Sequence, residues 1–362
     1  MSALNARPGI MDITPYVGGE STLPGRERVI KLASNEGALG PSPKAMAAYE
    51  AAAGELHRYP DGECLDLRRA IGRRHGLDWT RIVCGAGSDE LIALLCRAYA
   101  GPGDEVLHAE HGFLMYPIAA KAAGAKPVAA PETGLKADID ALIQRVTGRT
   151  RLLFLANPNN PTGTYLSGAE LRRLRDELPD DVLLVIDAAY AEYVTLEDYS
   201  PGADLVSKGG NVVMTRTFSK IHALGGARLG WAYCPPAIAD VLNRVRNPFN
   251  VSSPAQAAGL AAIDDTEFTN RALDHNETWR PWLAGRLEEL GLEVPSITGN
   301  FVLARFPLNS GRTADDADRH LKDHGIIVRR MAAYGLPDCL RITVGLEDEM
   351  RAVTDALAEF LK

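Results

Sequence analysis

Short apolar runs alternate with helical patterns through the first two thirds of the chain. The runs predict strands near 81–84, 105–108, 126–130, 151–156, 182–186 and 211–215. The segments LLFLA and VLLVI lack a period of two, which is typical of strands that are covered on both faces. Apolar residues between the runs recur with helical spacing. We therefore expect an α/β fold in which a mostly parallel sheet is covered by helices and joined by right-handed crossovers.

The pattern changes after about residue 255 and indicates a second, smaller α+β domain. Helices are predicted near 254–263 and 266–290, strands near 301–306, 326–329 and 339–344, and a last amphipathic helix from about 346. The first 30 residues are rich in Pro and Gly and have little periodicity, which is typical of an arm. We expect an N-terminal arm over 1–30, a large domain over 31–255 and a small domain over 256–362.

Composition narrows the classes of protein that the chain can belong to. Its 362 residues are 46% apolar and 24% charged, which is typical of a soluble globular protein. A net charge of −8 disfavours nucleic acid as a partner, although a few arginines in one pocket can still bind a small anion. The chain has neither a signal-peptide pattern nor an apolar run of about 18 residues, so we expect a cytoplasmic protein without membrane contact. The five cysteines lack metal-ligand spacing, and we expect no metal and no disulfide framework.

Polar residues follow four of the predicted strands, at the sheet edge where open parallel sheets bind their ligands. These segments are NPNNPTG over 157–163, Asp187, GAGS over 85–88 and TFSK over 217–220. Together they supply what pyridoxal 5′-phosphate requires of a protein. The cofactor needs an amine for a Schiff base, a carboxylate for its pyridine nitrogen, donors for its phenolic oxygen and a cradle for its phosphate.

Each requirement has a candidate residue. Lys220 can supply the amine, and Asp187 can keep the pyridine nitrogen protonated, which makes the ring an electron sink. Tyr190 and Asn157 can both donate to the phenolic oxygen and so lower the pKa of the Schiff base. A second Ser-Lys pair contains Lys208, but that lysine precedes a predicted strand whereas Lys220 follows one. We therefore assign the Schiff base to Lys220.

The phosphate cradle is predicted where GAGS meets the apolar-periodic stretch LIALLCRAYA. Backbone amides and a hydroxyl at a helix N-terminus can bind phosphate there. The predicted phosphate ligands are Ala86, Gly87, Ser88, Ser219 and Arg228. Phe113 can cover the face of the ring. Each segment alone also fits a plain helix cap or turn, so the prediction depends on their combination.

The ordered set of NPNNPTG, Asp187-x-x-Tyr190 and Ser219-Lys220 with Arg228 resembles the fold-type I, aspartate-aminotransferase-like pyridoxal phosphate enzymes. The resemblance spans nearly the whole chain. Further segments over 14–16, 31–36, 40–43, 58–61 and 340–345 resemble the histidinol-phosphate aminotransferase family. The resemblance implies a ping-pong exchange of amino groups through Lys220. Histidinol phosphate and imidazole-acetol phosphate form one substrate pair, and glutamate and 2-oxoglutarate form the other.

The same resemblance implies the remaining site residues. Tyr59 would reach the cofactor phosphate of the neighbouring subunit, which implies a homodimer with two shared sites. The implied substrate ligands are Tyr16, Asn35, Arg329 and Arg341. Guanidinium groups suit both the substrate phosphate and the distal carboxylate of glutamate. Arg330 is a rival to its neighbour Arg329.

Some positions depart from the family pattern and leave the substrate open. Ala188 replaces a common Glu, His222 replaces an aromatic residue, and Gly37-Ala38-Leu39 replaces an Asn-Pro-Tyr-like stretch. His222 could carry a proton, but we favour a packing role. Within the same fold, an aromatic amino-acid aminotransferase and a threonine-phosphate decarboxylase are alternatives. A non-catalytic regulator module would need a DNA-binding extension, and a dehydrogenase would need G-x-G-x-x-G.

Overall fold

A seven-stranded sheet forms the centre of the larger part of the protein. The computed structural model describes residues 5–208, 210–307 and 311–362. The strand order is β2 (Ile82–Gly85), β10 (Gly230–Tyr233), β9 (Val212–Thr217), β8 (Leu183–Asp187), β7 (Thr150–Ala156), β3 (Glu105–Ala109) and β4 (Lys126–Ala130). All of them run parallel except β10, which is antiparallel to both of its neighbours. The expectation of a mostly parallel sheet is confirmed, while β10 is an additional strand.

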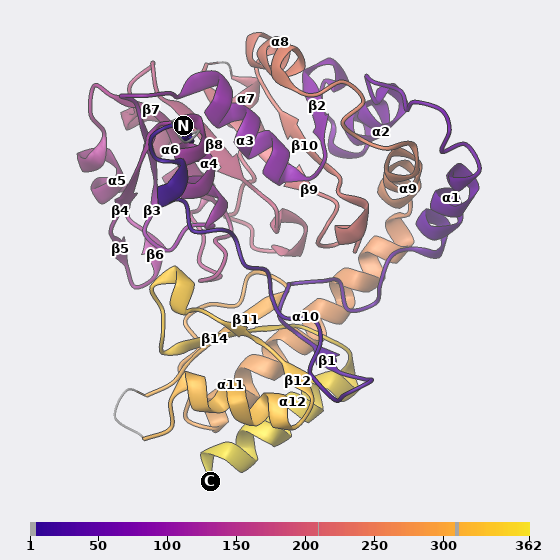
Figure 1. Ribbon diagram of the computed structural model, residues 1–362, viewed down its shortest axis with the longest axis vertical. Coiled ribbons are helices and arrows are strands. Elements are labelled where there is room, and N and C mark those ends of the chain that lie inside the picture. Colours follow the sequence, from indigo (N-terminus) through magenta and orange to yellow (C-terminus); the bar gives the residue numbers. More distant parts are fainter. Residues whose placement is uncertain (1–4, 209, 308–310) are drawn as a thin grey trace.

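Helices cover both faces of this sheet, as Figure 1 shows. The apolar cluster on one face includes residues of α3 (Ser88–Tyr99), α4 (Met115–Ala123) and α8 (Pro236–Val245). The cluster on the other face draws on α1 (Pro43–Ala53), α2 (Leu65–His75), α5 (Ile139–Arg145), α6 (Gly168–Glu177), α7 (Ala203–Ser207) and α9 (Ser253–Asp264). Strand β7 sends Leu153 and Leu155 into one cluster and Leu152 and Phe154 into the other. This two-sided burial explains why its sequence is apolar without a period of two.

The smaller part of the protein lies below the sheet in Figure 1 and has its own core. It contains the antiparallel strands β11 (Phe301–Arg305), β14 (Cys339–Thr343) and β13 (Arg329–Arg330). Three helices cover them, α10 (Thr266–Glu289), α11 (Ala314–Asp323) and α12 (Glu347–Leu361). The capping box of Thr313 and Asp316 begins α11, a helix that the sequence analysis does not predict.

The first strand of the chain joins the small domain. Strand β1 (Ile30–Lys31) pairs in parallel with β12 (Ile326–Ile327), and the chain then crosses to α1 in the large domain. The chain returns to the small domain at the junction of α9 and α10. Ser42 Oγ donates a hydrogen bond of 2.5 Å to Asp265 Oδ2 at that junction, and Lys44 Nζ lies 2.9 Å from Asp265 Oδ1. These two crossings therefore meet at Asp265. A further connection precedes β1, because Lys121 of α4 donates to the Asp12 carbonyl over 3.0 Å.

The remaining elements are short. They are η1 (Ile10–Asp12), η2 (Trp79–Arg81), η3 (Ala191–Tyr193), η4 (Gly225–Ala227), η5 (Ala332–Tyr334) and the hairpin of β5 (Glu132–Thr133) and β6 (Lys136–Ala137). Within the predicted arm, residues 1–4 lie outside the described residues. The predicted domain boundaries stay a prediction.

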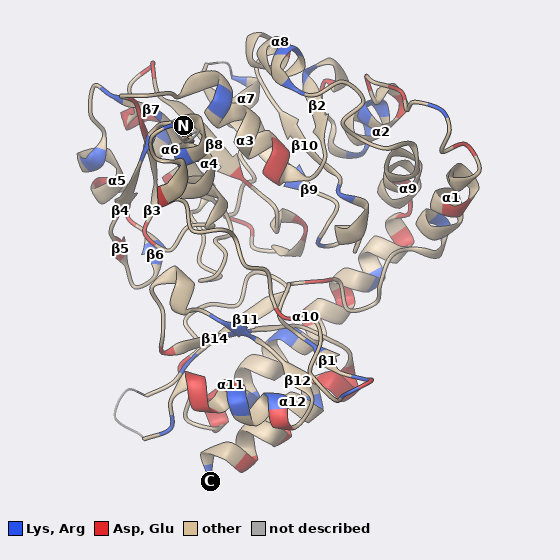
Figure 2. Cartoon of the chain, in the orientation of Figure 1, with Lys and Arg blue, Asp and Glu red and all other residues tan. Residues whose placement is uncertain are grey.

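Across the described residues, neither the charge distribution nor the apolar character of the helices singles out one segment of the chain. Acidic and basic residues are interspersed over both domains in Figure 2. Among the helices of the described part of the chain, none has the length and apolar character needed to cross a bilayer.

Candidate functional site

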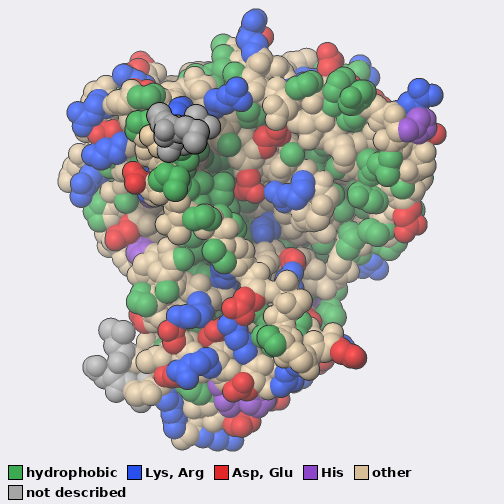
Figure 3. All heavy atoms as spheres, in the orientation of Figure 1, with side chains coloured by type: hydrophobic (Ala, Val, Ile, Leu, Met, Phe, Trp, Pro, Cys, Tyr) green, Lys and Arg blue, Asp and Glu red, His purple; other side chains and the backbone are tan. Residues whose placement is uncertain are grey.

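A cavity of about 350 Å³ opens between the sheet and the small domain. The surface is hollowed there, with basic side chains inside the hollow (Figure 3). Of the predicted site residues, the lining contains Tyr16, Asn35, Ser88, Phe113, Asp187, Tyr190, Ser219, Lys220, Arg228, Arg329 and Arg341. Strands β8 and β9 contribute at their carboxyl ends, which is the expected position for a ligand site in a parallel sheet.

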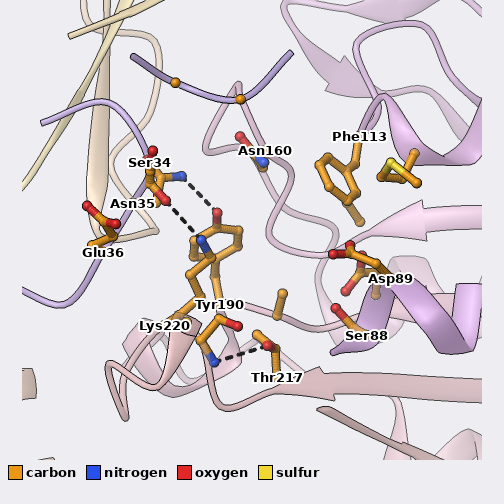
Figure 4. A pocket seen from close by; sticks show the side chains of 18 of the residues that line it. Ser34, Asn35, Glu36, Ser88, Asp89, Phe113, Asn160, Tyr190, Thr217 and Lys220 are labelled. Carbon is orange, nitrogen blue, oxygen red and sulfur yellow. Dashed lines mark hydrogen bonds between the residues drawn. The ribbon is translucent and has the colours of Figure 1, made fainter. Parts of the chain in front are cut away.

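Lys220 lies in the loop that follows β9. Thr217, the last residue of that strand, accepts a hydrogen bond from this loop. The Ser219 amide donates to Thr217 Oγ1 over 3.1 Å, and Lys220 Nζ donates to the Ser34 carbonyl over 3.1 Å (Figure 4). Burial, with a smaller contribution from the Arg341 guanidinium, lowers the pKa of the Lys220 amine to about 8. A substantial fraction of this amine is therefore neutral near physiological pH, and only a neutral amine is nucleophilic.

Asp187 ends β8 and is 5% exposed. The Tyr116 hydroxyl donates to its Oδ2 over 2.9 Å, and the Thr215 hydroxyl donates to its Oδ1 over 3.3 Å. Burial raises the pKa of the Asp187 carboxyl to about 6. Sequence reasoning missed Tyr116, because its place in the apolar pattern of α4 indicates only packing, and its ring does stack on Phe154 at 4.8 Å.

A candidate anion site lies at the N-terminus of α3. Ser88 is the first residue of this helix, and Arg228 Nη2 lies 3.0 Å from Asp89 Oδ2 in its first turn. A Cβ on Gly230 would clash with the Ser88 amide nitrogen, so this glycine lets β10 approach the helix end. Helix N-termini favour negative charge, and Arg228 adds a cation beside this one.

Two predicted phosphate ligands do not reach the cavity lining. The Ala86 amide donates to Glu90 Oε2 over 2.6 Å, so that donor already has a partner. Gly87 has φ 88° and a Cβ there would clash with Arg228 Nη2, which gives this glycine a conformational and steric role. The structure therefore brings Ser88, Ser219 and Arg228 together without these two residues.

The prediction that Asn157 faces the site is wrong. Its side chain is fully buried, with Nδ2 donating to the Leu166 carbonyl over 3.0 Å and Oδ1 accepting from the Leu166 amide over 2.7 Å. These two bonds close the loop that follows β7. Asn160 lines the cavity instead, and its Oδ1 accepts from Arg341 Nη1. The segment NPNNPTG contains three asparagines, and its sequence alone does not say which of them faces a ligand.

Tyr190 and Asn35 form a buried pair beside Lys220. Asn35 Nδ2 donates to the Tyr190 hydroxyl over 2.8 Å (Figure 4). Thr343 Oγ1 donates to Asn35 Oδ1 over 3.2 Å. Lys220 Nζ lies 5.7 Å from the centroid of the Tyr190 ring. Burial raises the pKa of the Tyr190 phenol, so the phenol stays a hydrogen-bond donor at neutral pH.

A second group of cations lies on the small-domain side of the cavity. Arg341 is buried on β14, and its Nη2 donates to the Ala33 carbonyl over 2.9 Å. Arg329 lines the cavity from β13 and donates to the Val17 carbonyl over 2.6 Å. Its neighbour Arg330 is half exposed and pairs with Asp315. The alternation of side chains along β13 thus places Arg329, and not Arg330, at the cavity.

Phe113 and Tyr16 form an aromatic edge of the cavity. Their rings meet edge to face at an interplanar angle of 76°, with centroids 6.2 Å apart. Tyr59 lies elsewhere. It is 83% exposed and stacks on Phe249 at 4.7 Å, on the surface near α1.

A buried ion pair lies beneath the lysine loop. Glu192, in η3 after Tyr190, is 2.6 Å from Arg216 Nη2 on β9. Nearby, the His222 ring packs on Phe218 at 5.0 Å, and burial lowers its pKa to about 4. His222 is therefore neutral at physiological pH and packs in the core, in agreement with the favoured reading of its sequence position.

The chain is similar to known aminotransferases over nearly its whole length. Residues 27–357 match the family model described as aminotransferase class I and II. A histidinol-phosphate aminotransferase of Paramagnetospirillum magneticum is 63% identical over 361 residues, which cover 100% of this chain and 99% of the relative. The corresponding protein of Rhodospirillum centenum is 60% identical, with both chains covered completely.

A solved structure has the same fold. The histidinol-phosphate aminotransferase of Sinorhizobium meliloti, in complex with pyridoxal-5′-phosphate, superposes with a TM-score of 0.90 at 29% sequence identity. The match covers 99% of this chain and 98% of that one.

Proposed function

The chain belongs to the class I and II aminotransferase family, and from this premise we propose that it transfers the amino group between histidinol phosphate and 2-oxoglutarate. One observation supports this reaction above all. The cavity combines Lys220, which follows β9, and the buried Asp187, which ends the neighbouring strand β8, with two separate sites for anions. One is the N-terminus of α3 with Arg228, and the other contains Arg329 and Arg341. A cofactor phosphate and an anionic substrate can therefore bind in the same cavity.

Pyridoxal phosphate fits the residues of the cavity. The Asp187 carboxylate is buried among hydroxyl donors, and a protonated pyridine nitrogen would supply the cation that such a group requires. Ser88, Ser219 and Arg228 would hold the phosphate at the N-terminus of α3, and Phe113 would cover the ring. When bound, the cofactor supplies an electron sink for negative charge at the substrate α-carbon.

The protein side chains have distinct parts in this chemistry. The Lys220 amine would hold the cofactor covalently between turnovers and, once released, would move a proton at the substrate α-carbon. Asp187 would keep the pyridine nitrogen protonated. The Tyr190 hydroxyl would donate to the phenolic oxygen, and we propose Asn160 in place of Asn157 as the amide of this site.

The cations of the small domain would select an anionic substrate. Arg341, Arg329 and Tyr16 would bind the phosphate of histidinol phosphate in one half-reaction and the distal carboxylate of glutamate in the other. Asn35 would contribute to substrate binding through its hydrogen bond to the Tyr190 hydroxyl. A single anion site would thus serve both substrates in turn, as a ping-pong mechanism requires.

We also propose a homodimer that works in the cytoplasm. The exposed stacked pair of Tyr59 and Phe249 lies outside the chain's own cavity, which is consistent with Tyr59 reaching the cofactor phosphate of the neighbouring subunit. The five cysteines are buried and free, as expected in a reducing compartment.

The substrate can be tested with the purified, cofactor-loaded enzyme. Histidinol phosphate, threonine phosphate, phenylalanine, tyrosine and glutamate are each mixed with it, and the visible absorbance of the bound cofactor is followed. We expect loss of absorbance with histidinol phosphate and with glutamate, and its recovery on addition of 2-oxoglutarate. Release of carbon dioxide from threonine phosphate, or a response to phenylalanine or tyrosine but not to histidinol phosphate, would contradict the proposal.

A further inference from the structure

Three potential metal ligands meet on the surface of the small domain, in a part of the molecule that the reaction does not use. His320 lies in α11, His324 is the C-cap of that helix, and Glu359 lies in α12. One ligand atom from each side chain lies within 4.8 Å of the other two. Histidine side chains are visible in this region over α11 and α12, beside acidic side chains (Figure 3).

The contacts of His324 show which of its ring nitrogens donates a hydrogen bond. Its Nδ1 lies 2.9 Å from the His320 carbonyl, and because a carbonyl only accepts, Nδ1 carries the proton of this hydrogen bond. In the neutral ring, Nε2 then has a free lone pair. That Nε2 faces Glu359 Oε2 at 3.5 Å, which is longer than a normal hydrogen bond. A histidine whose second nitrogen is fixed by a backbone carbonyl is the usual arrangement in metal sites.

His320 offers a second nitrogen without a partner. Among the residues that the structure describes, its Nε2 is buried and has no hydrogen-bond partner. The ring lies 4.4 Å from the His324 ring and 5.6 Å from the Phe360 ring, measured between centroids. These contacts hold the two imidazoles together on consecutive turns of one helix face.

We propose that His320, His324 and Glu359 form a binding site for a divalent transition-metal cation, with Zn²⁺ as the ion to test. Two imidazoles and a carboxylate suit this class of ion, and water can complete a tetrahedron. With metal–ligand bonds of about 2.0–2.2 Å, the ligand atoms would approach to roughly 3.4 Å of one another. Binding would therefore draw the three ligand atoms together from separations of up to 4.8 Å. The bound ion would connect the C-terminal ends of α11 and α12.

The experiment uses the cofactor-loaded enzyme, treated with a chelator and then dialysed. Isothermal titration with zinc chloride is expected to give one ion per chain, with a rise in the unfolding temperature that excess chelator reverses. His324→Ala and His320→Ala are expected to weaken this binding about tenfold or more, since even the hydrogen-bond partners of metal ligands contribute that much. Glu359→Gln is expected to weaken it while keeping the side-chain volume.

His57→Ala is a matched control. His57 Nε2 lies 3.9 Å from Glu55 Oε2 and the ring is exposed, so this pair offers one imidazole and one carboxylate without a second histidine. Its loss is expected to leave the zinc affinity unchanged. Magnesium chloride, an ion that prefers oxygen ligands, is expected to give no heat at the same concentration. Absence of zinc uptake by the chelated enzyme, or equal uptake by the His324→Ala and unsubstituted enzymes, would overturn the proposal.

Discussion

The Tyr116 hydroxyl donates a hydrogen bond of 2.9 Å to the Asp187 carboxylate, across the boundary between α4 and the end of β8. This bond and the one from Thr215 favour the ionised carboxylate, whereas burial disfavours it more strongly. The pKa of Asp187 therefore lies near 6, above the ordinary 3.8. In the cofactor-free protein the charged carboxylate reduces stability, and the cofactor's ring nitrogen would relieve this.

Asp187→Asn is expected to stabilise the cofactor-free protein and to weaken cofactor binding. A carboxyl whose folded pKa is raised reduces stability progressively as pH rises from about 4 to about 6, and the full cost of roughly 1–3 kcal/mol is present above that range. Urea unfolding at pH 8 should give a higher midpoint for the variant, and the gain should shrink at pH 5. Tyr116→Phe, which keeps the carboxylate, should not show this gain. Unchanged cofactor affinity in the Asp187 variant would contradict the role proposed for it.

The rate at which the cofactor-free enzyme takes up pyridoxal phosphate is expected to rise with pH through about 8. Only the neutral Lys220 amine attacks the aldehyde, and its lowered pKa sets the midpoint. Stopped-flow absorbance measures this profile, and a rate that is flat from about pH 6 to about 9 would contradict it. Lys220→Ala should abolish turnover and retain the fold, while Lys208→Ala, the other Ser-Lys lysine, should keep both.

Asn157 and Asn160 are expected to affect different properties. Asn157→Ala leaves the buried Leu166 amide and carbonyl without partners, at a cost of about 1–3 kcal/mol for each group, and should change kcat little. Asn160→Ala should lower kcat/KM by roughly tenfold, because a partner of Arg341 at the cavity is lost, and should leave the unfolding midpoint nearly unchanged. Denaturant unfolding and steady-state kinetics of both variants distinguish the roles. A large loss of kcat/KM in Asn157→Ala, with a loss of stability but not of activity in Asn160→Ala, would show that Asn157 and not Asn160 acts at the site.

Arg341→Lys is expected to lower kcat/KM for both substrates by roughly tenfold to a hundredfold. A lysine keeps the charge but loses the paired donors, and a hydrogen bond to a charged group contributes about 1.5–3 kcal/mol. Arg330→Lys is the control, because that side chain is half exposed and pairs with Asp315 on the surface. Equal effects of the two substitutions would mean that substrate anions bind elsewhere.

Much of the large domain could be predicted because its strands are covered on both faces. Two-sided burial produces continuous apolar runs, and such runs mark most of the six predicted strands, whereas the edge strand β4 is largely exposed. Strand β10 has only four residues, and its sequence GWAY follows a glycine-rich loop without a run of its own. Helix α11 has the polar sequence ADDADRHLKD, so its short buried stripe is hard to recognise.

At the site, sequence position predicted residues that follow strands directly, such as Asp187 and Lys220. It did not identify Tyr116, whose hydroxyl reaches Asp187 only through the packing of α4 on the sheet. Nor did it choose correctly among the asparagines of 157–163, because the choice depends on how the loop folds back on Leu166. The spacing of His320 and His324 is visible in the sequence, but only the packing of α11 on α12 brings Glu359 to them.

Two interdomain crossings meet at Asp265. Two of the covalent links between the domains are joined there through Ser42 and Lys44. A third link is the arm before β1, which Lys121 of α4 holds by donating to the Asp12 carbonyl over 3.0 Å. Residues 33–36 lie between β1 and Ser42 and line the cavity. Arg341 lies on β14 of the small domain and lines the same cavity. The bonds that Ser42 and Lys44 make to Asp265 therefore tie the segment that lines the cavity to the junction that holds the two domains together.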